Sequence, residues 1–239
     1  MLLEIKLIKK VNLEGHTLVA AFPGVGLVST LATGHMVDER KMEYVGFLEI
    51  EGITNYVGIY EGKPLPSIRI YHDPKEKLCV LLSEQSIPIN YSEVLANKIV
   101  EFCQKNKIKE VLLLSGMSSE GDRIFGVATN EELKKELKKI NVDIISEGII
   151  TGFVGVLLLK LSLANLKALN LIIESHSEYP ADPRGAAKLL KKAGEYLGIQ
   201  FNIKALEQAE AEIEQKIKML QKMKVRKEPK EELIPSMYG

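Results

Sequence analysis

Residues 17–29 read TLVAAFPGVGLVS, and this stretch decides the fold class of the chain. Its first six residues form a short apolar run that ends at Pro23 and Gly24, which predicts a buried β-strand. Residues 25–37 predict a helix that begins directly after this glycine turn. A buried strand that leads through a tight turn into a helix is the repeating unit of α/β proteins.

The same alternation of buried strands and helices continues along the chain. Further strands are expected at 45–50, 68–71, 78–82, 110–114, 143–145 and 166–174. Helices are expected from the N-cap Ser92 to 106, from the N-cap Asn130 to 139, at 151–161, and at 184–197 before the C-cap Gly198. We therefore expect residues 1–200 to form an α/β three-layer sandwich with a mainly parallel or mixed sheet.

Composition and charge exclude several classes of partner. The chain has 239 residues, and its 32 Lys and Arg residues balance 32 Asp and Glu residues, so its formal net charge is zero. This balance argues against a nucleic-acid or membrane-surface protein. The longest apolar segment, around 149–159, is too short to span a bilayer, and no signal peptide is expected. Cys79 and Cys103 lie in apolar contexts, which predicts buried, reduced thiols in a cytoplasmic protein.

The composition changes after residue 200. Residues 201–225 predict one long amphipathic C-terminal helix, whose narrow apolar stripe includes Leu206, Ile213, Ile217 and Leu220. A narrow stripe is typical of a helix that packs against a partner helix or protrudes from the body. Residues 226–239 contain prolines and clustered charges, which predicts a flexible tail.

The chain ends on Met237-Tyr238-Gly239, which has the form of a docking motif. The apolar side chain can fill a slot, the phenol adds contact area and a hydrogen bond, and the terminal carboxylate can meet a cation or backbone N–H groups. Such tripeptides also occur by chance at frayed termini. Their place at the end of a helical stalk and a flexible tail favours the docking interpretation.

Two glycine-rich or polar segments follow predicted strands, where α/β proteins place their sites. Pro23, Gly24 and Gly26 could cradle a phosphate at the helix start, but the pattern G-x-G-x-x-S lacks the third glycine. The interpretation as a structural turn is therefore favoured, and no Lys-Ser/Thr pair follows that would make a nucleotide-binding loop of the Walker type. Residues 115–122 form the second segment, which could bind a ligand or merely turn the chain.

Residues 174–182, with Ser175, His176 and Asp182, are the most polar stretch after a predicted strand. A Ser/His/Asp catalytic set is one interpretation, but the chain has no G-x-S-x-G elbow. A helix-entry loop with Asp182 as N-cap explains the same residues more simply. The four histidines are scattered without the spacing of a helical metal site, so neither catalytic residues, metal nor cofactor are expected.

Four segments together resemble the archaeal form of the proteasome-assembly-chaperone family, as homologues of proteasome assembly chaperone 2. They are 21–28 (AFPGVGLV), 114–116 (LSG), 147–158 (EGIITGFVGVLL) and 186–199, and the resemblance extends over about residues 1–200. One departure is Ser29, where a glycine is expected in many members. The resemblance implies a fold similar to that of nucleoside phosphorylases without their catalytic residues.

The resemblance also implies a homo-oligomer that acts without ATP in assembling the proteasome core particle or docking onto it. Met237, Tyr238 and Gly239 match, position by position, the tail by which some members enter pockets between proteasome α-subunits. Some archaeal relatives instead pair with a homologous chaperone subunit. Two other functions stay open: an α/β enzyme acting on nucleosides or other small molecules, with Gly24, Gly26, Ser115 and His176 near a pocket, and a scaffold that binds a paralogous subunit through the C-terminal helix.

Overall fold

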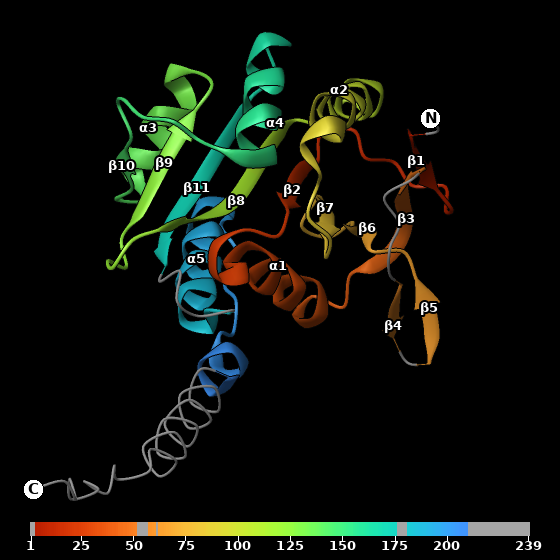
Figure 1. Ribbon diagram of the computed structural model, residues 1–239, viewed down its shortest axis with the longest axis horizontal. Helices are drawn as coiled ribbons and strands as arrows, with labels where there is room; N and C mark the ends of the chain where they lie inside the picture. The colour runs from red at the N-terminus through yellow and green to blue at the C-terminus, as the bar shows by residue number, and fades with distance from the viewer. Residues whose placement is uncertain (1–2, 52–56, 61, 176–180, 210–239) are drawn as a thin grey trace, which may run out of the picture.

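The computed structural model describes residues 3–51, 57–60, 62–175 and 181–209, which form a three-layer α/β/α structure (Figure 1). The strands are β1 Leu3–Leu7, β2 Thr17–Ala21, β3 Glu43–Ile50, β4 Gly58–Tyr60, β5 Lys63–Leu65, β6 Ile68–Asp73, β7 Leu78–Ser83, β8 Glu110–Ser118, β9 Ile124–Ala128, β10 Asp143–Ile144 and β11 Ala168–Ser175. The helices are α1 Val28–Glu39, α2 Ile89–Lys105, α3 Glu131–Lys139, α4 Gly152–Leu163 and α5 Pro183–Leu197, and a 3-10 turn, η1 Val25–Leu27, precedes α1. This architecture confirms the predicted fold class.

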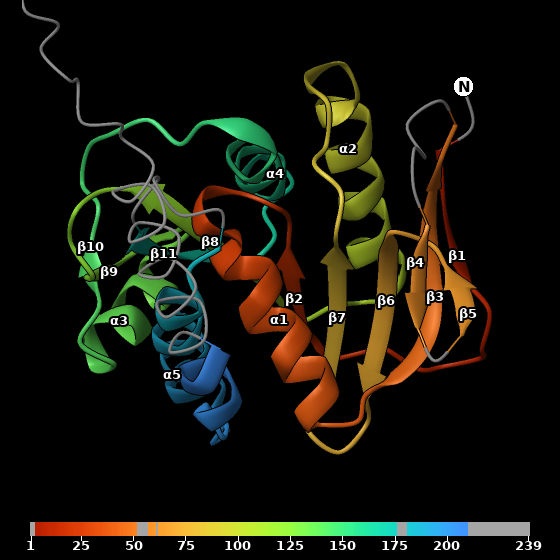
Figure 2. The same ribbon diagram turned by 60° about the horizontal axis from the view of Figure 1, so that its bottom comes forward.

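Nine strands form one mixed sheet in the order β1-β3-β6-β7-β2-β8-β11-β9-β10. Its centre is parallel, because β2 pairs in parallel with both β7 and β8, and β11 pairs in parallel with β8. The central strands carry continuous apolar runs, as expected for strands that are covered on both faces. Strands β4 and β5 form a separate antiparallel hairpin beside this sheet (Figure 2).

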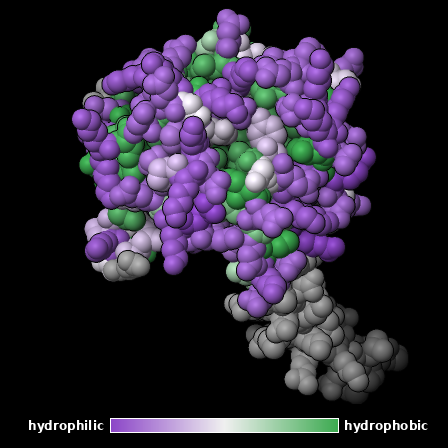
Figure 3. All heavy atoms as spheres, turned by 180° about the vertical axis from the view of Figure 1, so that it is seen from behind, coloured by the Kyte–Doolittle hydropathy of each residue, from purple (hydrophilic) through white to green (hydrophobic). Residues whose placement is uncertain are grey.

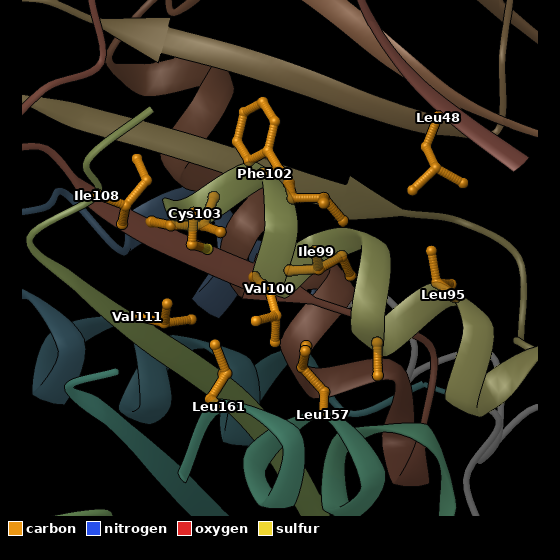
Figure 4. Close-up of a cluster of buried hydrophobic side chains, with 14 of the residues drawn as sticks. Leu48, Leu95, Ile99, Val100, Phe102, Cys103, Ile108, Val111, Leu157 and Leu161 are labelled. Carbon is orange, nitrogen blue, oxygen red and sulfur yellow. The ribbon is translucent and has the colours of Figure 1, made fainter. Parts of the chain in front are cut away.

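Helices cover both faces of the sheet and enclose two apolar cores. Helices α1, α3 and α5 pack on one face around residues such as Val28, Leu112 and Leu189. Helices α2 and α4 pack on the other face, where Leu95, Ile99 and Val100 of α2 lie beside Leu157 and Leu161 of α4 (Figure 4). Figure 3 shows apolar surface in separate patches among hydrophilic side chains on the face turned away in Figure 1. None of the described helices is both long and apolar enough to cross a membrane.

The start of α2 differs from the sequence-based expectation. The helix begins at Ile89, with the extended residue Pro88 as its N-cap, so the prediction of Ser92 as N-cap is wrong. The Ser92 hydroxyl lies inside the first turn and donates to the Pro88 carbonyl at 3.3 Å. Hydroxyl side chains can make this backward bond within a helix as well as cap its start, so the residue type alone does not fix the boundary.

Two other caps are confirmed. The Asn130 side-chain oxygen accepts from the Leu133 N–H at 2.9 Å, and Gly198 ends α5 in a left-handed conformation. Asp182 caps α5 and also holds the preceding strand. One of its carboxylate oxygens accepts from the Gly185 N–H at 2.7 Å, and the other accepts from the Ser175 hydroxyl at 2.7 Å.

We expect Asp182→Ala to lower the free energy of unfolding by about 1–2 kcal/mol, because it leaves two donors without their acceptor. Asp182→Asn keeps an acceptor oxygen and should retain much of this stability. Urea unfolding of both variants and of Asp143→Ala, which alters an exposed aspartate in β10, measures the effect. Equal losses in Asp182→Ala and Asp143→Ala would contradict the capping role.

A pair of buried histidines joins the amino end of β2 to β6. The Nε2 atoms of His16 and His72 lie 3.1 Å apart, so one ring must be the donor and the other the acceptor. Burial lowers the pKa of His72, and the neighbouring His16 lowers it further, while the carboxylates of Glu43 and Asp73 act in the opposite direction. The neutral form of His72 is therefore favoured in the folded protein.

The pH dependence of stability follows from this pair. The unfolded chain binds protons at the ordinary histidine pKa, about 6.5, more readily than folded His72 does, so stability should fall as the pH drops below that value. We expect the drop in Tm between pH 7.5 and pH 5.0 to be smaller in His72→Gln than in the unaltered protein. His35→Gln, which removes a histidine in α1, is the matched control. Parallel Tm–pH curves for His72→Gln and the unaltered protein would refute the expectation.

A buried arginine joins the β4–β5 hairpin to the sheet. The Arg69 side chain is 1% exposed, and its guanidinium makes two contacts with Glu84: Nη2 to Oε1 at 2.7 Å and Nη1 to Oε2 at 3.0 Å. It also donates to the Tyr71 hydroxyl at 2.7 Å and to the Pro66 carbonyl at 2.9 Å. The Tyr60 ring of β4 lies 4.4 Å from its Cζ, a cation–π distance. The Arg69 side chain therefore links the β4–β5 hairpin to the main sheet.

Candidate functional site: a crevice at the carboxyl ends of the parallel strands

The site is set by the order of the strands. Strands β2 and β8 are parallel neighbours, but the chain leaves β2 through α1 toward β3 and leaves β8 in the other direction, toward β9. Such a point of divergence opens a crevice outside the carboxyl ends of the two strands, where α/β proteins bind ligands. The glycine turn after β2 and the polar residues at the end of β8 both lie at this edge.

The turn after β2 requires a glycine at position 26. Gly26 has φ 61°, and a Cβ added to it would lie 2.4 Å from the Ser175 Oγ at the end of β11. Gly24 differs, because its φ of −153° is extended and an added Cβ would meet nothing within 4 Å. Leu27 is also left-handed, with φ 50°, so the chain enters α1 through a 3-10 turn rather than directly at Val25. Pro23 lies between the strand and this turn.

Ser29 has a role that its sequence context does not reveal. Its buried hydroxyl donates to the Phe22 carbonyl at 2.7 Å and so ties the first turn of α1 to the end of β2. The serine that departs from the family pattern thus makes a hydrogen bond that a glycine lacks.

A pocket of about 810 Å³ occupies the crevice. Its lining comes from the turn after β2, the end of β8, the β7–α2 loop at Ser86 and Ile87, and the whole segment 145–154, which leads into α4. The sequence-predicted residues Pro23, Gly24 and Ser115 lie in this lining, whereas Gly26 lies behind it against Ser175. Pocket and turn are thus parts of one site.

The floor of the pocket contains a buried polar pair that the sequence analysis missed. The Ser115 hydroxyl, which lines the pocket, donates to the side-chain oxygen of Asn170 at 3.1 Å. Asn170 is fully buried in β11, and its Nδ2 has no hydrogen-bond partner. One signal could have found it: Asn170 is the single polar residue in the apolar run 168–173. A buried, half-satisfied amide costs stability and so indicates a role beyond packing.

The loop after β11 is only partly described. Ser175 and Asp182 are hydrogen-bonded to each other, as above, but His176 lies outside the described residues. Glu174 accepts from the Arg123 backbone N–H at 3.0 Å and from the Ser119 hydroxyl at 2.9 Å, and these bonds lower its pKa. The described part of this loop therefore has a structural explanation and supplies no catalytic set.

The stalk and tail residues lie mostly beyond the described part of the chain. Ile213, Ile217, Leu220, Met237, Tyr238 and Gly239 are outside it. Leu206 is described and corrects the expectation of a partner-facing residue: it is 7% exposed and packs in the core formed by α1, α3 and α5. Residues 204–209, which follow α5, are helical, and this short helical segment places the Leu206 side chain against the core of the domain.

The described residues contain no cluster of three or more His, Cys, Asp or Glu side chains placed to hold a metal ion. Cys79 and Cys103 are both buried, and burial raises the pKa of each thiol, to about 12 for Cys103. Thiols in this state are poor nucleophiles. This agrees with the prediction of packing cysteines.

The fold and the crevice define a class of protein. It is a three-layer α/β protein with a ligand-sized pocket at its parallel strand ends, and Glu147 is the only ionisable residue among the described residues that line this pocket. The sequence model of the PAC2 family matches residues 18–221. The chain belongs to the PAC2 family.

Relatives and solved structures agree with this assignment. The chain is 32% identical to the uncharacterized protein MJ0106 of Methanocaldococcus jannaschii over 212 residues, which cover 88% of this chain and 87% of the relative. The crystal structure of Pyrococcus furiosus PbaA, an archaeal homologue of proteasome-assembly chaperone, is 27% identical, with a TM-score of 0.84 and 93% coverage of each chain. That of P. furiosus PbaB, an archaeal proteasome activator, shares the fold at 21% identity and a TM-score of 0.80, covering 92% of this chain and 98% of PbaB.

Proposed function

We propose that this protein is a proteasome assembly chaperone or core-particle activator that docks onto the α-ring through its C-terminal tail. The observation that carries the proposal is the likeness to PbaA over 93% of both chains, since PbaA is an archaeal homologue of proteasome-assembly chaperone. PbaB, an archaeal proteasome activator, shares the fold. Membership of the PAC2 family and the terminal Met-Tyr-Gly support the same assignment.

The proposal divides the chain into a core domain at 1–200, an amphipathic helix at 201–225 and a docking tail at 226–239. Tyr238 is the anchor, Met237 fills the adjacent apolar slot, and the Gly239 carboxylate pairs with a cation of the α-ring pocket. One tripeptide buries little area and binds weakly. Several tethered copies on one oligomer raise the effective concentration and multiply the affinity by about a hundredfold or more.

A homo-oligomer is part of this proposal, and α4 supports it. Leu159 and Leu163 are 56% and 69% exposed on a helix that is apolar nearly all round, a pattern typical of helices covered on all sides. A second copy of the chain would cover this face. A paralogous chaperone subunit is the other occupant that the proposal admits.

The proposal assigns a binding role, without ATP and without catalysis, in the cytoplasm. The described pocket lining has one ionisable side chain, Glu147, and no His, Lys or Cys that could complete a catalytic set with a lining serine. The sequence contains no Walker-type loop after Gly24 and Gly26. Both features support a chaperone or activator over the enzyme alternative.

Capture of purified α-ring and of assembled core particle by the immobilised protein tests the proposal. We expect the unaltered protein to retain both, and Tyr238→Ala to lose them. Ser236→Ala, which alters the residue directly before the motif, is the matched control and should behave as the unaltered protein does. Capture of neither target by the unaltered oligomer would refute the proposed function.

A further inference from the structure

The charge of the crevice pocket restricts the kinds of molecule that it can hold. Among its described lining residues there is no Lys, Arg or His, and the single ionisable side chain, Glu147, is an acid. A phosphate or another multiply charged anion would meet no oppositely charged side chain there, only the backbone N–H groups at the start of α4, beside the acidic Glu147. Nucleotides and sugar phosphates are therefore poor candidates, and the pocket favours an uncharged molecule.

The size and the walls of the pocket indicate a small molecule with a ring. Its volume of about 810 Å³ lies within the range of about 300–1,000 Å³ that is typical of small-molecule sites. Phe22 and Phe153 meet edge to face in its wall, with ring centroids 4.5 Å apart, and Ile87, Ile150 and Val127 add aliphatic surface. Walls of this kind bind a planar or apolar body.

Polar groups converge on the same space. Serines line it at positions 86, 115, 118 and 146, besides Ser29, whose buried hydroxyl is bonded to the Phe22 carbonyl. The N-cap Thr151 and the first residue of α4, Gly152, also line it, and the Thr151 side chain accepts no hydrogen bond from the helix-start N–H groups. These groups suit a ligand that carries several hydroxyl or carbonyl oxygens.

The Ser115–Asn170 pair gives an independent reason to expect a ligand. Asn170 is fully buried and bonded to a pocket-lining hydroxyl, yet its Nδ2 has no partner. An amide can present either its oxygen or its nitrogen to a neighbouring hydroxyl. When the nitrogen donates to Ser115, the Ser115 hydroxyl hydrogen is released toward the pocket. A ligand atom that accepts a hydrogen bond from the Ser115 hydroxyl would therefore favour this orientation of the amide, in which the Asn170 Nδ2 donates to Ser115 and no longer lacks a partner.

Two glycines allow the backbone segments that form the pocket walls to pack closely. A Cβ added to Gly116 would lie 2.7 Å from the Val25 carbonyl oxygen, and one added to Gly155 would lie 2.3 Å from the Ile150 carbonyl oxygen. The end of β8 is thus packed on the turn after β2, and α4 is packed on the loop that precedes it. A preformed pocket of this kind binds without first ordering its walls.

From size, charge and lining we propose that the pocket binds an uncharged molecule of nucleoside size, in which a planar ring system carries several hydroxyl groups. The ring would lie against the apolar wall, and the hydroxyl groups would meet the serines and the start of α4. Binding at this site is separate from tail docking and stands or falls independently of it.

Thermal unfolding and calorimetry with adenosine, guanosine, cytidine and uridine test the proposal, with AMP as the charged comparison. We expect at least one nucleoside to raise Tm by roughly 3–6 °C at about ten times its Kd, and its monophosphate to bind at least ~10-fold more weakly. Ser115→Ala should weaken nucleoside binding by ~10-fold, since it removes the floor hydroxyl.

Two tryptophan variants separate the pocket from the rest of the surface. Ser86→Trp places a large side chain at the pocket and should abolish binding, whereas Lys138→Trp alters an exposed lysine of α3 outside the lining and should not. The proposal is overturned if none of the four nucleosides binds, if both variants bind alike, or if AMP binds more tightly than adenosine. Binding of a peptide ending in Met-Tyr-Gly in place of every nucleoside would also overturn it and assign the pocket to the chain's own tail.

Discussion

Removing Met237, Tyr238 and Gly239 is expected to abolish capture of the α-ring while leaving the oligomer intact. The three residues supply the apolar contact, the phenol and the carboxylate of the proposed docking motif, and none belongs to the described body. Because several tails act together, loss of the motif from every copy removes the multivalent gain as well as each single contact. We expect apparent affinity to fall by about a hundredfold or more.

The measurement is sedimentation of the truncated and unaltered proteins, alone and with purified α-ring. In the absence of the α-ring, the truncated and unaltered proteins must have the same sedimentation coefficient. This agreement shows that truncation leaves the oligomer unchanged. A chain extended by one residue after Gly239 is a sharper control, since it keeps every side chain and only moves the carboxylate. If the truncated protein still co-sediments with the α-ring, the binding surface lies on the folded body and the tail hypothesis fails.

Arg69→Met is expected to lower the free energy of unfolding by roughly 3–5 kcal/mol, the usual cost of removing one partner from a buried ion pair. It leaves Glu84, the Tyr71 hydroxyl and the Pro66 carbonyl without their shared donor. It also removes the cation that lies against the Tyr60 ring, which joins β4 to the sheet. For a chain of this size the loss corresponds to a fall in Tm of roughly 6–20 °C.

Urea unfolding of Arg69→Met, Arg69→Lys and Lys6→Met measures this effect. Arg69→Lys keeps the charge but not the two-atom contact with Glu84, so an intermediate loss is expected. Lys6 pairs with Glu49 at the exposed edge of the same sheet, where solvent screens the ion pair and its loss should change stability little. If Arg69→Met and Lys6→Met were equally stable, Arg69 would not be the link between hairpin and sheet.

The central part of the fold could be predicted from the sequence because its strands are covered on both faces. Strands β2, β7, β8 and β11 carry continuous apolar runs between turn residues. The bounds expected for β2, β7 and β11 lie within two residues of the observed ones, whereas β8 continues four residues past its expected end, to Ser118. The strands that were missed lie where this signal is weak. Strand β1 (LEIKL) alternates polar and apolar residues at the sheet edge, and β9 contains Gly126. Strands β4 and β5 have three residues each.

The site was predicted in part, for a similar reason. The glycine turn and Ser115 were found because each follows a recognisable buried strand, and parallel strand ends meet at one edge. Asn170 was missed because its role depends on Ser115, whose hydroxyl lies 3.1 Å away on the neighbouring strand β8 but 55 positions away in sequence. Segment 145–154 was noted as a glycine-rich helix entry, but its position over the crevice follows from tertiary packing.

The packing of α1 on α5 has a consequence for how the chain is made. Helix α1 is complete at residue 39, yet the helix that covers it does not begin until Pro183. At ribosomal rates the intervening residues take on the order of ten seconds to synthesise, and during that time the apolar face of α1 lacks its final cover. Strand β8 likewise lacks its neighbouring strand until β11 has been synthesised. A nascent chain of this protein thus has to stay free of aggregation for most of its own translation before its second core can close.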